Sequence, residues 1–262
     1  MPAPDLRVSQ LRFSYTTDAG ARLAVIDDLD ISLAPNEFVS IIGPSGCGKS
    51  TLFNMIAGLQ VPDSGAIMLG DDDIVGRPGS VTYMMQRDFL LPWRTVLENV
   101  TLGPELAGKS LATAHAEARK LIRRFGLEGF EDVYPTALSG GMRQRAALLR
   151  TILCDRPIIL LDEPFGALDA LTRASMHEWL LGIQREFQCA MILITHDPDE
   201  AVYLSDRVYV STPRPMRIAG IVEIDLPAER HRDITLSPEF AAHKRHVLSL
   251  LHAISTPLAA AH

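Results

Sequence analysis

The sequence has few cysteines, no long apolar run and no segment typical of a leader. Its three cysteines are an odd number and lack the C-x-x-C spacing of zinc and redox sites. We therefore expect reduced thiols and a cytosolic protein. No stretch approaches the roughly 18 apolar residues that span a bilayer, and residues 1–5 lead into alternating strand-like residues instead of the apolar segment of a signal peptide. Any connection to a membrane should therefore run through a partner.

The chain also lacks an excess of positive charge. It has 25 Lys and Arg against 32 Asp and Glu, which gives a net charge of −7. This balance argues against a nucleic-acid partner, because neutralising a phosphate backbone requires a positive surface. Hydrophobic residues make up 47% and charged residues 22%, as in ordinary globular chains. A chain of 262 residues can form one large domain or two small ones, with a well-buried core.

Hydrophobic patterning predicts two kinds of strand. Residues 6–13 alternate between apolar and polar side chains, which is typical of a strand with one buried face. Residues 23–33 predict a strand pair with a polar turn at Asp27-Asp28. Short strands are expected at residues 66–69 and 81–85, and continuously apolar strands at residues 158–161, 191–194 and 208–210. Apolar strands separated by helices indicate a parallel sheet that is covered on both faces.

The middle of the chain is dominated by helices. From about residue 88 to about residue 154, apolar residues recur at helical spacing, with glycine and proline between the segments. The expected helices cover residues 95–100, 111–125 and 141–154, and the expected breaks are Gly103-Pro104, Gly126 and Pro135. A helical insert therefore interrupts an α/β core. Beyond Pro213, we expect a strand within residues 218–226 and a helix over residues 240–252.

One stretch matches the pattern G-x-x-x-x-G-K-[ST], with a strand-like run at residues 38–42 before it and helix-compatible residues after it. Its residues are Gly43, Pro44, Ser45, Gly46, Cys47, Gly48, Lys49, Ser50 and Thr51. Glycines let successive N–H groups converge on phosphate oxygens, and the helix that follows adds its positive end. Lys49 would contact the β- and γ-phosphates, and the Ser50 hydroxyl would hold Mg²⁺. We predict a nucleoside triphosphate site; the alternative is a glycine-rich turn with a solvated lysine.

A pair of carboxylates follows a buried strand. The apolar run at residues 158–161 leads into Asp162-Glu163, and ligands bind where the carboxyl ends of parallel strands converge. We expect Asp162 to lie behind Mg²⁺, beside Ser50. Glu163 is predicted to accept a proton from the water that attacks the γ-phosphate. The alternative is a pair of surface acids that cap the next turn.

His196 ends a later strand at the same edge of the predicted sheet. Asp197 is suited to cap the helix that follows, with Pro198 in its first position and Glu200 completing a capping box. His196 is therefore a candidate for a contact with the γ-phosphate, and ordinary packing is the alternative.

An aromatic residue and a second glycine pair complete the candidate site. Tyr15 ends the first strand, where it is either a platform for adenine, a stacking contact worth about 1–3 kcal/mol, or locally packed. Ser139 is a good helix N-cap, and Gly140 and Gly141 expose backbone N–H groups before a long helix. This second helix start suits an anion but is far from the first in sequence. Two chains arranged head to tail would give each nucleotide both kinds of helix end.

In combination, these motifs resemble the nucleotide-binding subunit of an ATP-binding cassette (ABC) transporter. The resemblance covers about residues 6–206 and rests on residues 43–50, Gln86, residues 138–142, Asp162-Glu163, Leu168-Asp169 and His196. It implies an α/β fold: a RecA-like P-loop NTPase core with a mostly parallel sheet, an antiparallel β subdomain near the N-terminus and an inserted α-helical subdomain. It identifies ATP and Mg²⁺ as the expected cofactors.

The resemblance also assigns roles to residues. Gln86 would sense the γ-phosphate and join Ser50 and Asp162 around Mg²⁺, and Glu163 and His196 would be catalytic with it. In a homodimer, Ser139, Gly140 and Gly141 would engage ATP bound to the second copy, and Asp169 would line the dimer seam. Met142 stands where the family usually has glutamine. We expect this departure to change seam packing more than catalysis, because the backbone N–H groups are untouched.

The segment after Gln86 narrows the resemblance. Residues 90–100 and 165–173 are similar to importer subunits of the nitrate, sulfonate and taurine group, which includes uptake systems for thiamine-precursor pyrimidines. Leu91 and Trp93 suit a groove for a cytoplasmic helix of a membrane subunit; the alternative is that Trp93 packs inside the helical insert. The resemblance thus implies two transmembrane permease subunits that contact the chain near residues 86–93. It further implies a separate solute-binding protein and a peripheral place on the cytoplasmic face of the inner (plasma) membrane.

We therefore expect a single ABC ATPase domain over residues 1–262. Its core would cover about residues 1–87 and 156–212, its helical subdomain about 88–155 and its C-terminal extension about 213–262. The tail after His196 is too short for the regulatory β-domain of some sugar importers. The alternative function is a soluble ABC ATPase that serves a cofactor-assembly or other non-transport complex. The sequence does not name the transported solute.

Overall fold

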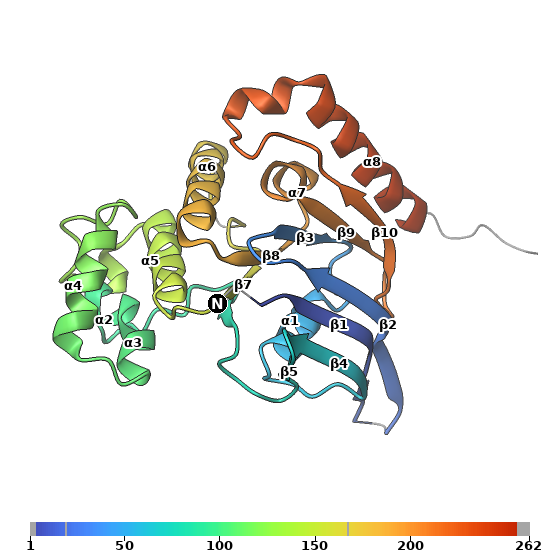
Figure 1. The fold of residues 1–262 in the computed structure, drawn as a ribbon, viewed down its shortest axis with the longest axis horizontal. Helices are drawn as coiled ribbons and strands as arrows, with labels where there is room; N and C mark the ends of the chain where they lie inside the picture. The colour runs from blue at the N-terminus through green and yellow to red at the C-terminus, as the bar shows by residue number, and fades with distance from the viewer. Residues whose placement is uncertain (1–3, 19, 167, 256–262) are drawn as a thin grey trace, which may run out of the picture.

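Figure 1 shows the computed structural model of the chain, which describes residues 4–18, 20–166 and 168–255. The predicted domain also includes residues 1–3 and 256–262, which lie outside the described residues, as does Ala167 in the motif at residues 165–173. Two β-sheets form the centre, and helices surround the larger one.

The larger sheet has six strands in the order β10-β9-β3-β8-β7-β6. Their bounds are β3 (Phe38–Ile42), β6 (Thr82–Met84), β7 (Ile158–Asp162), β8 (Ala190–Thr195), β9 (Arg207–Ser211) and β10 (Ile218–Glu223). Neighbours pair in parallel except for β10, which runs antiparallel to β9. Because β3, β7 and β8 are parallel, their carboxyl ends meet at one edge. The predicted mostly parallel sheet is confirmed.

The smaller sheet has four antiparallel strands in the order β2-β1-β4-β5. Their bounds are β1 (Leu6–Thr16), β2 (Arg22–Leu33), β4 (Ser64–Leu69) and β5 (Asp72–Asp73). The strand pair predicted within residues 23–33 is wrong, because β2 is a single strand. Asp28 has a φ of 52°, and the register with β1 shifts between Leu29 and Ile26. The polar pair therefore marks an irregularity within one strand, where one residue in the left-handed region breaks the pairing.

Different elements cover the two faces of the larger sheet. Along β3, Phe38 and Ile42 belong to a core shared with α6 (Ala170–Phe187), α7 (Pro198–Leu204) and α8 (Pro238–Ser255). Val39 and Ile41 belong to a second core, shared with α1 (Lys49–Ile56) and the smaller sheet. Side chains alternate across a strand, so that β3 contributes to both cores. The predicted C-terminal strand and helix are confirmed as β10 and α8, which are joined through the 3₁₀ helix η2 (Arg232–Leu236).

Four of the described helices gather at one side of the molecule, on the left of Figure 1. They are α2 (Val96–Val100), α3 (Leu102–Leu106), α4 (Leu111–Ile122) and α5 (Gly140–Ile152), with the 3₁₀ helix η1 (Pro135–Ala137) before α5. The three helices predicted here are confirmed to within a few residues. The break expected at Gly103-Pro104 is wrong, because the pair lies inside α3. Pro104 is tolerated in the first turn, where a backbone N–H has no intrahelical partner in any case.

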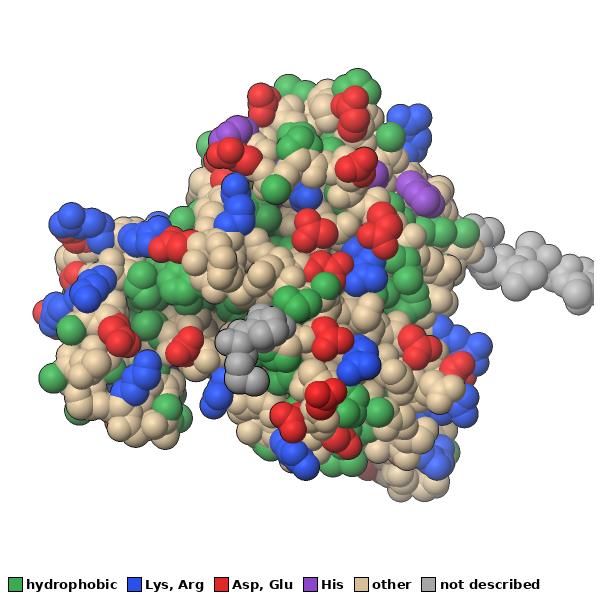
Figure 2. Space-filling model, viewed as in Figure 1, with side chains coloured by type: hydrophobic (Ala, Val, Ile, Leu, Met, Phe, Trp, Pro, Cys, Tyr) green, Lys and Arg blue, Asp and Glu red, His purple; other side chains and the backbone are tan. Residues whose placement is uncertain are grey.

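The surface carries charges of both signs. Figure 2 shows acidic and basic side chains interspersed over the face it presents. No helix in the described ranges combines the length and the apolar character that crossing a membrane would require.

Candidate nucleotide site

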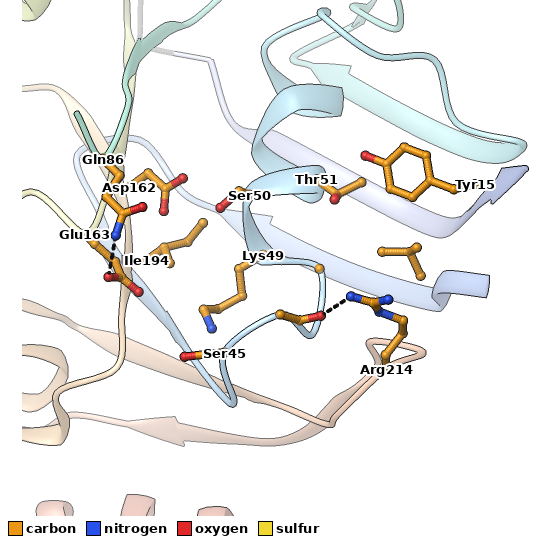
Figure 3. Close-up of a pocket in the computed structure, with 13 residues that line it drawn as sticks. Tyr15, Ser45, Lys49, Ser50, Thr51, Gln86, Asp162, Glu163, Ile194 and Arg214 are labelled. Atoms are coloured by element: carbon orange, nitrogen blue, oxygen red, sulfur yellow. Dashed lines mark hydrogen bonds between the residues drawn. The ribbon is translucent and has the colours of Figure 1, made fainter. Parts of the chain in front are cut away.

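A cavity of about 350 Å³ opens where β3 and β7 end, next to β1 and β2 of the smaller sheet (Figure 3). Its wall brings together many of the predicted site residues: Tyr15, Ser45, Gly46, Gly48, Lys49, Ser50, Thr51, Gln86, Asp162 and Glu163. Gly43, Pro44 and Cys47 belong to the same loop but do not line the cavity. Distant parts of the chain therefore meet at the edge that the sequence indicates.

Neighbouring elements leave no room for a side chain at two positions of the phosphate loop. A Cβ at Gly43 would collide with the Ser211 hydroxyl and lie 2.9 Å from the Ser211 carbonyl oxygen. Gly48 has a φ of 129°, which side chains rarely permit, and a Cβ there would lie 3.0 Å from Cγ1 of Val25. Contacts with β9 and β2 therefore fix the curled path of the loop.

The Lys49 ammonium turns back onto the loop that carries it. Its Nζ donates to the carbonyl oxygens of Gly43, at 2.8 Å, and Pro44, at 2.9 Å. The residue is only 7% exposed. A cation held inside a curled backbone at a helix start is the arrangement that captures phosphate. Lys49 would exchange carbonyl oxygens for phosphate oxygens when a nucleotide binds.

Asp162 is a buried carboxylate beside the first turn of α1. It is 5% exposed, and its Oδ2 accepts a hydrogen bond from the Tyr83 hydroxyl at 3.1 Å. Burial raises the pKa of Asp162, although the hydroxyls of Ser50 and Tyr83 and the charge of Lys49 act in the opposite direction. A carboxylate that is costly to bury suits a cation, and it supplies with Ser50 the oxygen ligands that Mg²⁺ prefers. The residues therefore fit the predicted Mg²⁺ site.

Glu163 enters the cavity from an unusual backbone position. Its φ is 46°, in the left-handed region that residues with side chains rarely occupy, and its N–H donates to the Ile194 carbonyl oxygen at 2.9 Å. Oε2 accepts a hydrogen bond from Nε2 of Gln86 at 3.1 Å, and Oε1 lies 3.4 Å from Nδ1 of His196. Each carboxylate oxygen thus has a neighbour from the predicted site. The His196 side chain is 63% exposed, so the packing alternative is wrong.

Tyr15 and Arg214 lie at the end of the cavity away from the carboxylates (Figure 3). The Tyr15 ring packs edge-on against Phe13, with centroids 4.8 Å apart, and its hydroxyl donates to Oε1 of Gln60 at 3.4 Å. Tyr15 is nevertheless 43% exposed and lines the cavity. Local packing and a role toward a nucleotide are therefore compatible.

Arg214 is a site residue that sequence reasoning missed. Its Nη2 donates to the Gly46 carbonyl oxygen at 2.6 Å. It reaches the loop because its segment pairs with β2, where the Met216 N–H donates to the Val25 carbonyl oxygen at 2.7 Å. No local motif marks Arg214, and only this long-range pairing brings it to the cavity.

Ser139, Gly140, Gly141 and Asp169 lie outside the wall of this cavity. Ser139 caps α5, because its Oγ accepts from the Met142 N–H at 3.3 Å, and Met142 packs partly buried against the core. Asp169 caps α6 and accepts from the Thr172 hydroxyl at 2.6 Å. Hydrogen bonds from the hydroxyl and N–H of Thr172 lower the pKa of Asp169. Both helix starts are formed, but neither lines the cavity of this chain.

One further prediction needs correction, and one alternative is excluded. Glu200 does not complete a capping box at α7; it turns inward and accepts from the Thr195 hydroxyl at 2.6 Å. Glu200 is buried against Thr195 and α6 and therefore does not reach the start of α7. Asp197 alone caps the helix, because its side chain accepts a hydrogen bond from the Asp199 N–H. The alternative that Trp93 packs inside the helical insert is excluded, since its side chain is 71% exposed.

Comparison with known proteins agrees with this geometry. The fold and the cavity define a P-loop ATPase. The sequence profile described as ABC transporter matches residues 26–166, which is more than half of the chain. The chain belongs to the ABC transporter family, and the predicted family and fold class are confirmed.

Relatives of known name cover most of the chain. It is similar to the formylaminopyrimidine import ATP-binding protein ThiZ of Halalkalibacterium halodurans, with 43% identity over 87% of this chain and 86% of that protein. It is also similar to the taurine import ATP-binding protein TauB of Yersinia pseudotuberculosis, with 40% identity over 85% of this chain and 89% of that protein.

Solved structures resemble the fold. A dimeric structure of the bacterial ABC transporter cassette MJ0796 has a TM-score of 0.75 and 26% identity, covering 85% of this chain and all of that one. A second structure of MJ0796 is a dimeric post-hydrolysis state bound to ADP and phosphate, with a TM-score of 0.74 and 25% identity. Nucleotide binding is thus a property of the cassette to which this chain is similar.

Proposed function

We propose that the chain is the ATP-hydrolysing subunit that powers import of a small solute through an ABC transporter. The observation that carries this proposal is the cavity that joins the phosphate loop to Glu163 at one sheet edge. The import function of the named relatives supports the direction of transport.

In this proposal the phosphate loop and Lys49 bind the triphosphate, and adenine stacks on Tyr15. Ser50, Gln86 and Asp162 would hold Mg²⁺. All three residues line the cavity, and each carries a side-chain oxygen, the kind of ligand that Mg²⁺ prefers. When bound, Mg²⁺ neutralises charge on the β- and γ-phosphates. Thr51 and Gly46 complete the loop around the phosphates.

Glu163 is the proposed base. It accepts a proton from the attacking water while the oxygen of that water bonds to the γ-phosphorus and the bond to the ADP oxygen breaks. The contacts of its two oxygens with Gln86 and His196 support this role, because they orient the carboxylate. We propose that His196 contacts the γ-phosphate and that Gln86 transmits the presence of that phosphate to the segment that follows it.

We further propose that two copies form a homodimer around two ATP molecules. Ser139, Gly140 and Gly141 of one copy would contact ATP on the other, and Asp169 would line the seam. Support comes from the capped start of α5, which offers N–H groups outside the cavity of its own copy, and from the dimeric cassettes of similar fold. ATP favours closure because it contacts both copies only in the closed form.

The membrane partners are proposed to be two permease subunits, with a separate solute-binding protein acting through them. Beside Gln86, Phe89 is 54% exposed and Trp93 is 71% exposed. Such exposed apolar side chains suit a docked cytoplasmic helix. The chain would then lie at the cytoplasmic face of the plasma membrane, without a nucleic-acid partner.

The solute is proposed to be a small sulfonate or a pyrimidine precursor, by similarity to TauB and ThiZ, or a nitrate-like anion, by the resemblance described from the sequence. We propose that the chain is a single ATPase domain. Residues 88–155 would be the helical subdomain that moves with Gln86, and residues 213–262 an extension of the core.

Purification from the native cell membrane tests this function. We expect the chain to co-purify with an integral membrane protein and to hydrolyse ATP, and K49A to lose ATP binding at micromolar concentrations. A complex that contains only soluble partners would favour an assembly ATPase instead. A chain without ATP hydrolysis, alone and in its complex, would contradict both.

A further inference from the structure

We propose that Arg173 is a positioning residue that ties the segment at the dimer seam to the segment that carries His196. The inference rests on the proposed function, in which Asp169 lines the seam and His196 faces the γ-phosphate. These two residues precede different helices, since Asp169 caps α6 and His196 lies just before the cap of α7. Arg173 lies near the start of α6 and contacts both segments.

The Arg173 guanidinium reaches a backbone carbonyl on one side and carboxylates on the other. Its Nη2 donates to the Leu168 carbonyl oxygen, next to Asp169, at 3.0 Å. Its Nη1 lies 3.7 Å from Oδ2 of Asp197, and its Nε lies 3.7 Å from Oε1 of Glu200. Because this one guanidinium is hydrogen-bonded to the Leu168 carbonyl oxygen and lies within ion-pair distance of two carboxylates, a single side chain links both segments.

Glu200 is the buried anchor of this contact. Its side chain is 7% exposed, and its Oε1 also lies 3.4 Å from Nε2 of His177 on α6. Its Oε2 accepts from the Thr195 hydroxyl at 2.6 Å, and the Thr195 oxygen accepts from the Asp197 N–H at 3.0 Å. Glu200 therefore holds Thr195, on one side of His196, and Thr195 in turn holds Asp197, on the other side.

The charge of Glu200 is maintained in spite of its burial. Burial alone would raise the pKa of Glu200, but the nearby His177 imidazole, the hydrogen bond from Thr195 and the charge of Arg173 keep that pKa below its usual range. A buried charge that lost a partner would be left poorly compensated. Removing Arg173 should therefore disturb Glu200 more than the loss of an exposed ion pair would.

The same cluster adjoins the proposed base. A small cavity of about 40 Å³ is lined by Glu163, His196, Arg173, Thr195 and Glu200, among others. Arg173 thus lies one layer behind the catalytic edge and does not line the nucleotide cavity itself. Because a displacement of about 1 Å at a catalytic group can lower a rate about 100-fold, a residue in this layer can change turnover without changing nucleotide affinity.

The first test compares the variants R173Q and R173K with R185Q in the full chain. Arg185 is a matched control, because it lies on α6 and its Nε donates to the Leu181 carbonyl oxygen of the same helix at 3.2 Å. We expect R173Q to lower kcat about 10- to 100-fold while the Kd for ATP, measured by calorimetry, stays within about twofold of wild type. The kcat of R173K should lie between those of R173Q and wild type, since an ammonium cannot contact both segments at once. The kcat of R185Q should match that of wild type.

A double-mutant cycle distinguishes positioning of His196 from a general loss of structure. In an H196A background, R173Q should lower kcat by less than about twofold further, because the residue that Arg173 positions is already absent. Combining R173Q with E200Q should likewise give less than the product of the two single losses. R173K serves the same cycle if R173Q does not give a cooperative melting transition.

Three results would overturn the proposal, and the first two are a wild-type kcat in R173Q and the same fold-loss for R173Q with and without His196. A change in the Kd for ATP that accounts for the whole loss of activity would also overturn it. Failure of the wild-type chain to hydrolyse ATP, alone and in its membrane complex, would instead contradict the proposed function, on which this inference depends.

Discussion

Single side chains around the cavity are oriented by their own chain. Lys49 is bonded to the carbonyl oxygens of Gly43 and Pro44, Arg214 to that of Gly46, and Glu163 to Gln86. Such groups lose little conformational freedom when a ligand arrives, so more of each contact appears as binding or rate. Substitutions at these residues should therefore act on binding and on hydrolysis in distinguishable ways.

The substitution E163Q should separate ATP binding from hydrolysis. Glutamine keeps the hydrogen-bonding shape but cannot accept the proton, so turnover should fall about 10²- to 10⁴-fold, roughly 3–5 kcal/mol of barrier. The Kd for ATP should stay near that of wild type. Phosphate release and calorimetry on the same preparation check both quantities, and a variant that hydrolyses at the wild-type rate would remove Glu163 from the role of base.

The substitution R214A should weaken ATP binding about 3- to 10-fold, because it removes a cation beside the phosphate loop, and the difference should shrink at high salt. R217A is the control: Arg217 lies in the same segment but pairs with Asp27 and does not line the cavity. Titrations at two salt concentrations measure the effect. Equal affinities for wild type and R214A at low salt would show that Arg214 only supports the loop.

At the scale of elements, the start of α6 links stability to pH. Hydrogen bonds from Thr172 lower the pKa of Asp169 from its usual 3.8. The cap therefore stabilises the fold above pH 3.8, and its contribution is lost as the pH falls through the lowered pKa of the folded state. D169N keeps a capping side chain that does not titrate.

We expect the melting temperature of wild type, relative to D169N, to decline as the pH is lowered from about 6 to about 3, measured without nucleotide. A difference that stays constant over this range would show that the charge of Asp169 does not contribute to the cap.

Helices and strands were predictable where their own residues carry the pattern, and not where distant contacts decide the structure. Continuous apolar runs were enough to predict β7, β8 and β9, because a strand that is buried on both faces has apolar residues at consecutive positions. The irregularity at Asp28 and the short helix α3 were not predictable, since the first depends on pairing with β1 and the second places Gly103-Pro104 in a first turn. Spacing likewise favoured a cap for Glu200, but tertiary contacts with Thr195 and His177 outweighed it.

The same distinction applies to the site. Local sequence was enough to predict three features of the site: the phosphate loop, the carboxylate pair and His196. The order of the strands then brings them to one edge of the sheet. Arg214 and Arg173 carry no such local signal. Their places depend on the pairing of residue 216 with β2 and on the contact of α6 with α7.

At the scale of the whole molecule, the chain carries two kinds of anion-ready helix start in different places. The start of α1 lies in the cavity, whereas the start of α5 belongs to the helical group at the side of the core. In one copy alone, the cavity therefore lacks the α5 start that the proposed mechanism also uses. Full activity should require two copies, each completing the site of the other.

Light scattering of E163Q with and without ATP and Mg²⁺ tests this requirement most directly. Without nucleotide, we expect a mass near the 28.7 kDa of one chain. With ATP, we expect twice that mass, and we expect the specific activity of wild type to fall on dilution. A chain that stays monomeric with ATP bound while wild type hydrolyses at full, dilution-independent rate would contradict this requirement.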